Sequence, residues 1–127
     1  MPGKIKFEQE YVVRTSPKIL YDRLATADGL AQWFADDVNV KDNLYNFVWD
    51  GIGQKAKIIH EKQGKYIRFQ WIEDADEDVY FEFKMDIDDL TSDVSLIITD
   101  FAEEKEMEES KMLWDSQVNH LMQIIGS

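Results

Sequence analysis

Aromatic side chains recur at alternate positions in three segments of this sequence, and these rows are the residues best suited to form a binding surface. The rows are Tyr45, Phe47 and Trp49; Ile67, Phe69 and Trp71; and Val79, Phe81, Phe83 and Met85. Alternate residues of a strand point to the same face of a sheet, so each row presents one continuous apolar edge. Such an edge either packs into a hydrophobic core or lines a pocket for an apolar ligand, and the spacing is compatible with both.

Three further aromatic residues lie in segments with helical spacing, namely Trp33, Phe34 and Trp114. His60 follows Ala56 and Ile58 at alternate positions, and this phase allows it to face the interior with them. The alternative for His60 is a place at the rim of the fold. The candidate contacts for a small apolar ligand are therefore one histidine and seven aromatic residues: His60, Trp33, Trp49, Phe69, Trp71, Phe81, Phe83 and Trp114.

Metal and catalytic sites find little support in the sequence. The chain has no cysteine, and its 2 histidines lack the spacing of zinc ligands. The acidic residues between 86 and 93 do not follow the calcium-loop pattern, because Thr91 stands where that pattern needs glycine. Glycine-rich phosphate loops and the Gly-x-Ser-x-Gly motif are also absent. We therefore assign no catalytic residue, no metal site and no cofactor.

The charge balance restricts the classes of partner. Asp and Glu number 26, Lys and Arg number 14, and the formal net charge is −12. Nucleic acids and anionic membrane surfaces bind basic patches, so neither is an expected partner. No apolar run is long enough for membrane insertion. The first residues lack the apolar core of a signal peptide, which favours a cytoplasmic location. The oligomeric state stays open.

The length and the hydropathy pattern indicate one domain over residues 1–127. The chain of 127 residues has the usual size of a single domain, and no linker or repeat divides it. Alternation of apolar and polar residues predicts a first strand from Ile5 to Val13. The same signal predicts further strands over 37–40, 44–50, 54–62, 65–73, 78–88 and 93–101. Their short connections predict antiparallel pairing.

Helical signals lie near both ends of the chain. Ser16 and Pro17 predict the start of a helix, Asp28 and Gly29 predict a break, and residues 30–34 predict a second short helix. The final segment, from about residue 103, combines acidic first turns with one apolar stripe, made by Met107, Trp114, Val118, Leu121 and Ile125. The expected fold is α+β: a curved antiparallel sheet of six to seven strands wrapped around a long C-terminal helix, with two short helices after the first strand.

Several segments together resemble one known superfamily. They are the helix start at 15–26, the stretch 24–34 that ends in Trp-Phe, the hairpin 58–71, the late strand that ends in Asp100-Phe101, and the final helix with its early Trp114. Their order and spacing are similar to START-like (SRPBCC, helix-grip) domains, and most similar to the branch named after activators of the heat-shock chaperone ATPase (AHSA-type). His60 stands where that branch often has glutamate, and Asp100 replaces a small residue.

The resemblance implies a cavity between the sheet and the C-terminal helix, but a fold of this kind serves several functions. Members bind lipids, sterols or other apolar molecules, some are cyclases or dehydratases, and some are partners of chaperones. The preferred hypothesis is non-catalytic binding of a small hydrophobic or lipid-like ligand, which requires open space among the aromatic candidates. The second is a chaperone-associated interaction module with a basic protein partner. The third is a cyclase-type or hydrolase-type enzyme, for which His60 is the only ready candidate.

Overall fold

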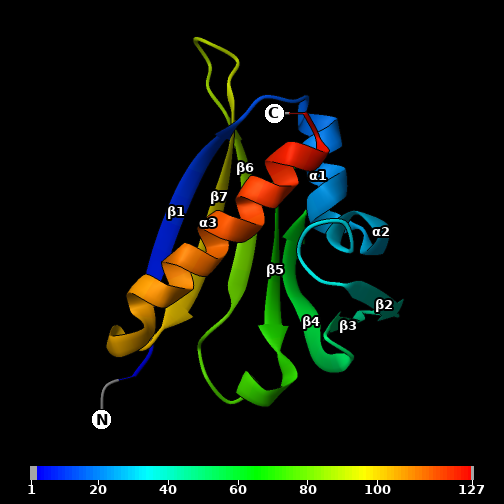
Figure 1. Ribbon diagram of the computed structural model, residues 1–127, viewed down its shortest axis with the longest axis vertical. Coiled ribbons are helices and arrows are strands. Elements are labelled where there is room, and N and C mark those ends of the chain that lie inside the picture. The colour runs from blue at the N-terminus through cyan, green and yellow to red at the C-terminus, as the bar shows by residue number, and fades with distance from the viewer. Residues whose placement is uncertain (1–2, 127) are drawn as a thin grey trace.

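The computed structural model describes residues 3–126 and contains a seven-stranded antiparallel sheet whose inner face is covered by helices (Figure 1). The strand order is β1-β7-β6-β5-β4-β3-β2. The strands are β1 Ile5–Val13, β2 Asp37–Lys41, β3 Leu44–Trp49, β4 Ile52–Lys62, β5 Tyr66–Trp71, β6 Phe81–Ile87 and β7 Val94–Ala102. All the strands predicted from alternation are present, and the α+β helix-grip architecture is confirmed.

Two α-helices follow β1 and one ends the chain: α1 Pro17–Ala25, α2 Ala27–Leu30 and α3 Met107–Ile124. Short 3-10 turns, η1 Ile72–Asp74 and η2 Glu104–Glu106, precede β6 and α3 respectively. The helix α3 crosses the inner face of the sheet diagonally, and α1 and α2 lie beside its C-terminal half (Figure 1). The long C-terminal helix is therefore the element that the sheet grips.

The break between the two short helices lies earlier than the sequence predicts. Thr26 ends α1 and begins α2, because its hydroxyl accepts a hydrogen bond from the N–H of Gly29 at 2.9 Å. Gly29 lies inside α2, so the prediction of a break at Gly29 is wrong. Its small size serves close packing, since a Cβ there would lie 2.7 Å from the Cα of Arg23. Trp33 and Phe34 then fall in a turn after α2 and not in a helix.

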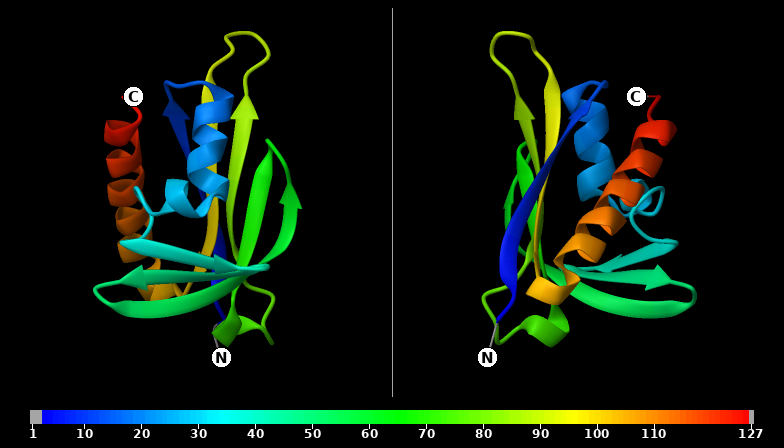
Figure 2. Two further views of the ribbon diagram at one scale, coloured as in Figure 1. Left: turned by 90° about the vertical axis from the view of Figure 1, so that its right-hand side faces the viewer. Right: turned by 60° about the vertical axis from the view of Figure 1, so that its left-hand side comes forward.

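The sheet is strongly curved. In Figure 2, β2, β3 and the first part of β4 run across the direction of β5, β6 and β7. The two-residue turns after β2 and β3 use left-handed backbone, with φ of 57° at Asp42 and 50° at Asp50, and the three-residue turn after β4 has φ of 79° at Gly64, as tight hairpin connections favour. This curvature brings β3 round toward α3 and creates a closed inner side.

The inner face is lined by the aromatic rows. Phe47, Phe69, Phe81 and Phe83 are each at most 1% exposed, and they face the buried stripe of α3, which contains Trp114, Val118 and Leu121. Burying a side chain of this size contributes about 1.5–3 kcal/mol to stability relative to leaving it exposed. The core between the sheet and α3 is therefore the main source of stability.

A polar cluster joins the other side of α3 to the edge strand β1. The hydroxyl of Tyr11 donates to Oδ1 of Asp115 at 2.6 Å. Nε2 of Gln9 donates to the same carboxylate oxygen at 3.0 Å and to the carbonyl of Lys111 at 3.2 Å. We call Gln9, Tyr11 and Asp115 the β1–α3 clip. It fixes α3 against the sheet and so determines how close α3 lies to the ends of β3, β5 and β7.

Candidate functional site

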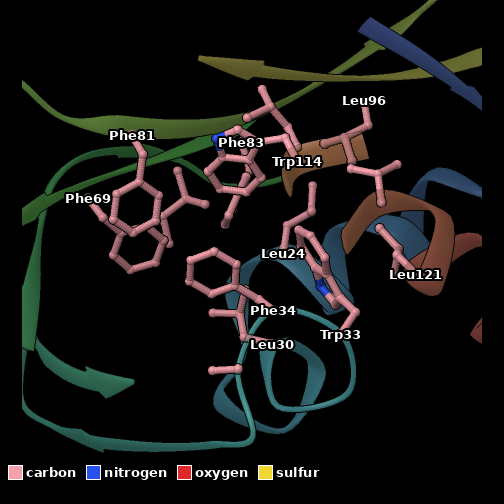
Figure 3. Close-up of a cluster of buried hydrophobic side chains, with 14 of the residues drawn as sticks. Leu24, Leu30, Trp33, Phe34, Phe69, Phe81, Phe83, Leu96, Trp114 and Leu121 are labelled. Carbon is pink, nitrogen blue, oxygen red and sulfur yellow. The ribbon is translucent and has the colours of Figure 1, made fainter. Parts of the chain in front are cut away.

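Phe34 occupies the centre of the interior. Its ring centroid lies 5.1–5.7 Å from the centroids of Phe47, Trp49, Phe81, Phe83 and Trp114. Figure 3 shows Phe34 entering from the segment after α2 and pointing toward Phe69 and Phe81. At these separations aromatic rings are in contact. Side chains thus fill the space in which a helix-grip domain would hold a large ligand.

A narrow cleft remains at one edge of this aromatic cluster. Its volume is about 160 Å³, and we call it the aromatic cleft. Trp49 ends β3, Trp71 ends β5 and Asp100 lies close to the end of β7. Since neighbouring strands are antiparallel, these three alternate strands have the same polarity within the curved sheet, and their C-terminal ends lie along the same end of it. The cleft is lined by Phe34, Trp49, Trp71, Asp100, Ser110, Leu113, Trp114 and Gln117.

Half of the residues that line the cleft are aromatic. The rings of Phe34 and Trp114 are nearly parallel, with 9° between their planes and 5.7 Å between their centroids. The centroid of Trp71 lies 6.1 Å from that of Trp49. Both of these strand tryptophans are half-buried, so each contributes surface to the core and to the cleft. Trp49 and Trp71 therefore supply the more exposed part of the aromatic lining, since Phe34 and Trp114 are almost fully buried.

Hydrogen bonds within the protein engage several donors near the cleft. Nε1 of Trp49 donates to the carbonyl of Phe34 at 2.8 Å, and Nε2 of Gln117 donates to the same oxygen at 3.2 Å. Nε1 of Trp114 donates to Oδ2 of Asp100 at 2.9 Å. These bonds fix the orientations of two tryptophan rings and of the carboxylate before any ligand arrives.

Asp100 is the titratable residue among those that line the cleft. Burial raises the pKa of its carboxyl above the ordinary value, and nearby Asp74 adds to the rise. Hydrogen bonds from the Phe101 N–H and from Trp114, together with the charge of Lys4, act in the opposite direction on this pKa. A carboxylate has about four acceptor positions, and the protein's donors to Asp100 are the N–H groups of Phe101 and Trp114. Asp100 retains capacity to accept a further hydrogen bond.

The structure brings together three of the predicted contact residues and separates the others. Trp49, Trp71 and Trp114 line the aromatic cleft. The other four aromatic candidates lie inside the core, away from the lining of the cleft: Trp33, Phe69, Phe81 and Phe83. The ring of Trp33 contacts Phe83 at a centroid distance of 5.4 Å, and its Nε1 donates to the carbonyl of Arg23 at 2.8 Å. That Trp49, Trp71 and Trp114 contact a ligand stays a prediction.

His60 does not face the interior, so that part of the prediction is corrected. The pairing of β4 with β5 shifts between Ile58 and His60, and such a bulge changes the face to which the following side chains point. His60 is exposed, and its Nδ1 lies 3.0 Å from the hydroxyl of Tyr66. It therefore lies outside the aromatic cleft, and the enzyme hypothesis loses its one candidate group.

Asp100 is one of the cleft residues that are missing from the predicted ligand contacts, as Phe34 also is. Asp100 continues the alternation of Val94, Leu96 and Ile98, which are all buried, so the phase of the strand already places it on the inner face. An acid in phase with buried apolar residues is the signal that could have found it. Ser110, Leu113 and Gln117 carry no comparable signal, because they lie between the residues of the apolar stripe of α3.

Other hollows of the surface are wider. One of them, of about 420 Å³, is lined by Trp33, Phe34 and Trp49 together with Asp36 and His120. A groove of about 560 Å³ lies between α1 and the β4–β5 hairpin, and its charged lining residues include Lys18, Asp22, Arg23 and Glu61. A second groove, of about 540 Å³, follows the outer side of α3 and has no aromatic residue in its lining. The aromatic cleft is the candidate site, since its lining surface is mainly apolar and includes the half-buried Asp100, whereas the lining surface of the hollow beside Trp33 is mainly polar.

Among residues 3–126, no group of three or more His, Asp or Glu side chains is placed to hold a metal ion. No helix in that range has both the length and the apolar character needed to cross a bilayer.

Comparisons with known proteins agree with the geometry of the fold. The sequence model of the START-like superfamily domain matches residues 1–127. The solution structure of BfR322 from Bacteroides fragilis is 38% identical in sequence, with a TM-score of 0.71, over 98% of this chain and 92% of that one. A comparison with curated proteins of described function gave no match.

Two more distant structures share the fold alone. The Aha1 dimer from Colwellia psychrerythraea is 16% identical, with a TM-score of 0.77, over 95% of this chain and 96% of that one. Protein MLL2253 from Mesorhizobium loti is 13% identical, with a TM-score of 0.78, over 96% of this chain and 97% of that one. Neither likeness carries a function over to this chain.

Proposed function

The chain belongs to the START-like superfamily, and from this premise we propose that it binds a small apolar group, about the size of one aromatic ring, in the aromatic cleft without chemical conversion. The observation that carries the proposal is the convergence of Trp49, Trp71 and Trp114 on one cleft between the sheet and α3. This place corresponds to the mouth of the space that the sheet and α3 enclose.

The size of the cleft limits the ligand. A volume of about 160 Å³ is close to the roughly 150 Å³ of an engineered apolar cavity that binds benzene. A sterol or an acyl chain needs far more room, and Phe34 occupies the centre of the interior where such a ligand would lie. We therefore propose a ring-sized ligand in place of the lipid-like one.

The lining favours binding over catalysis. General acid–base or nucleophilic catalysis usually needs two cooperating groups within hydrogen-bond reach. Asp100 is the titratable residue of the lining, and its partners are an indole N–H and a backbone N–H. These donors orient the carboxylate but do not exchange protons with a substrate. A binding function fits this arrangement.

The test fills the cleft with a larger side chain. Ser110 is half-buried in the lining, so Ser110→Leu places a branched apolar group in the cleft, while Ser116→Leu makes the same change on the outer side of α3. Leucine has higher helix propensity than serine, so both variants are expected to fold. Titration with benzyl alcohol, followed by tryptophan fluorescence, is expected to give saturable binding to the wild-type protein and to Ser116→Leu.

For Ser110→Leu we expect at least about tenfold weaker binding of benzyl alcohol, which is a loss of about 1.4 kcal/mol. An absence of saturable binding to the wild-type protein would overturn the proposal. Equal binding to all three proteins would also overturn it, because the ligand would then lie outside the aromatic cleft.

A second candidate function is recognition of a protein partner, and one observation favours it. Leu113 at the mouth of the cleft is 60% exposed and Met112 beside it is 68% exposed, in a helix that begins with several glutamates. Apolar residues bordered by acids suit a basic partner. Under this alternative, which includes the chaperone-associated role of the AHSA-type branch, binding of the partner weakens strongly as salt increases.

A further inference from the structure

We infer that the ligand of the aromatic cleft is a small organic cation, a substituted ammonium group on an apolar body. This inference rests on the proposed function and adds the charge of the ligand to it. The first support is the wall itself. Faces of Trp, and also of Phe, attract cations through the negative potential above the ring, and Phe34, Trp49, Trp71 and Trp114 all line the cleft.

The second support is the carboxylate in the same wall. Oδ2 of Asp100 lies 2.9 Å from Nε1 of Trp114, and Oδ1 lies 2.8 Å from the N–H of Phe101. These two bonds hold the carboxylate in a fixed orientation, and unused acceptor positions remain. Lys4, a nearby cation, is paired with Asp74 at 3.7 Å. Lys4 is thus shared between Asp74 and Asp100, and a ligand cation would add positive charge beside the Asp100 carboxylate.

The third support is the charge of the segments on both sides of the cleft. Trp71 is followed within two residues by an acidic loop, made by Glu73, Asp74, Asp76, Glu77 and Asp78. Ser110 is preceded by a second acidic segment, made by Glu103, Glu104, Glu106, Glu108 and Glu109. Lys105 lies within the second segment, but both segments carry net negative charge, and net charge around a cleft raises the local concentration of the opposite ion. The same charge opposes entry of fatty acids and other anions.

The test compares two probes of nearly the same shape. Choline carries a quaternary nitrogen, and 3,3-dimethylbutan-1-ol has carbon in its place, so the pair differs in charge and not in size. Tryptophan fluorescence of the wild-type protein at low salt is expected to show at least about tenfold tighter binding of choline, as a cation–π contact with a nearby carboxylate allows.

Matched variants assign this preference to one residue. Asp100→Asn removes the charge in the cleft, and Asp89→Asn removes one charge from the exposed β6–β7 hairpin, which projects from the opposite end of the sheet (Figure 1). The preference for choline is expected to fall to about threefold or less in Asp100→Asn and to persist in Asp89→Asn. Circular dichroism checks that both variants are folded, and the wild-type comparison stands even where a variant does not fold.

Equal affinity of the wild-type protein for the two probes would overturn the inference of a cation and leave the proposed function intact. A preference that survives in Asp100→Asn would overturn the assignment to this cleft. Failure of both probes to bind would overturn the inference as well, while the benzyl alcohol titration of Ser110→Leu and Ser116→Leu decides the proposed function separately.

Discussion

Asp100 is the residue with the greatest consequence for both stability and binding. Its carboxyl lies between the sheet and α3, where burial raises its pKa and where Lys4, Asp74, Trp114 and the Phe101 N–H also act on it. A folded-state pKa above the unfolded value means that the protonated form favours folding. This contribution to the free energy of unfolding is fully present below the unfolded pKa of about 3.9 and is lost as pH rises through the folded pKa.

The Asp100→Asn variant makes this linkage measurable, because asparagine does not titrate. The quantity compared is the free energy of unfolding of the wild-type protein minus that of the variant. We expect this difference to be larger at pH 4 than at pH 7. Urea unfolding of both proteins at the two pH values gives the difference. A difference that is the same at both values, or larger at pH 7, would show that the raised pKa of Asp100 is not coupled to folding.

At the scale of elements, the position of α3 depends on the β1–α3 clip. The hydroxyl of Tyr11 donates to Asp115 at 2.6 Å, and burial raises the pKa of this tyrosine above its ordinary value. Tyr11→Phe removes the hydroxyl but keeps the ring, so we expect a loss of about 1.5–3 kcal/mol, the usual value for a hydrogen bond to a charged group. Thermal or urea unfolding measures it.

Tyr66→Phe is the matched control, because its hydroxyl lies on the exposed side near His60. Its expected effect on the free energy of unfolding is within about 0.5 kcal/mol, as for other surface changes. Similar losses in the two variants would contradict the clip, since they would reflect a general effect of removing a hydroxyl. Amide exchange in α3 is expected to become faster in Tyr11→Phe alone.

The strands and the long helix could be predicted from the sequence because their signals are local. Alternation is nearly unbroken in β3, β5, β6 and β7, and the stripe of α3 repeats at helical spacing. The phase of β4 could not be predicted beyond Ile58, because the bulge before His60 is set by pairing with β5 and not by composition. The helix break was misplaced because Gly29 serves packing and not termination.

The candidate site could be predicted only in part, for a reason that lies in packing. Core residues and cleft residues are the same aromatic types on the same face of the sheet, so Phe81 and Trp71 look alike in the sequence although only Trp71 reaches the cleft. Both are terminal residues, since Trp71 ends β5 and Phe81 begins β6. Phe81 pairs with Phe69, so Trp71 extends two residues beyond that pair toward the cleft. The strand order β7-β6-β5-β4-β3 places the C-terminal ends of β3, β5 and β7 at one end of the sheet. Asp100 lies among these ends, and this strand order is not encoded in any local sequence signal.

At the scale of the whole molecule, charge opposes compactness. The formal net charge is −12, so the acidic side chains repel one another across the folded surface. Salt screens this repulsion, because the Debye length falls from ~10 Å at 0.1 M to ~3 Å at 1 M. We therefore expect the midpoint of urea unfolding to rise between about 0.1 M and 1 M sodium chloride. An unchanged or lower midpoint would show that the acids are not mutually destabilising.

The central claim concerns one cleft in an otherwise filled interior, and the four indole N–H signals of the protein report on it directly. In ¹H–¹⁵N spectra recorded during a titration with benzyl alcohol, the signals of Trp49, Trp71 and Trp114 are expected to shift together and to saturate, because these rings line the aromatic cleft. The signal of Trp33, whose Nε1 donates to Arg23 inside the core, is expected to stay in place. No shift in any of the first three, or an equal shift in all four, would contradict the proposed function.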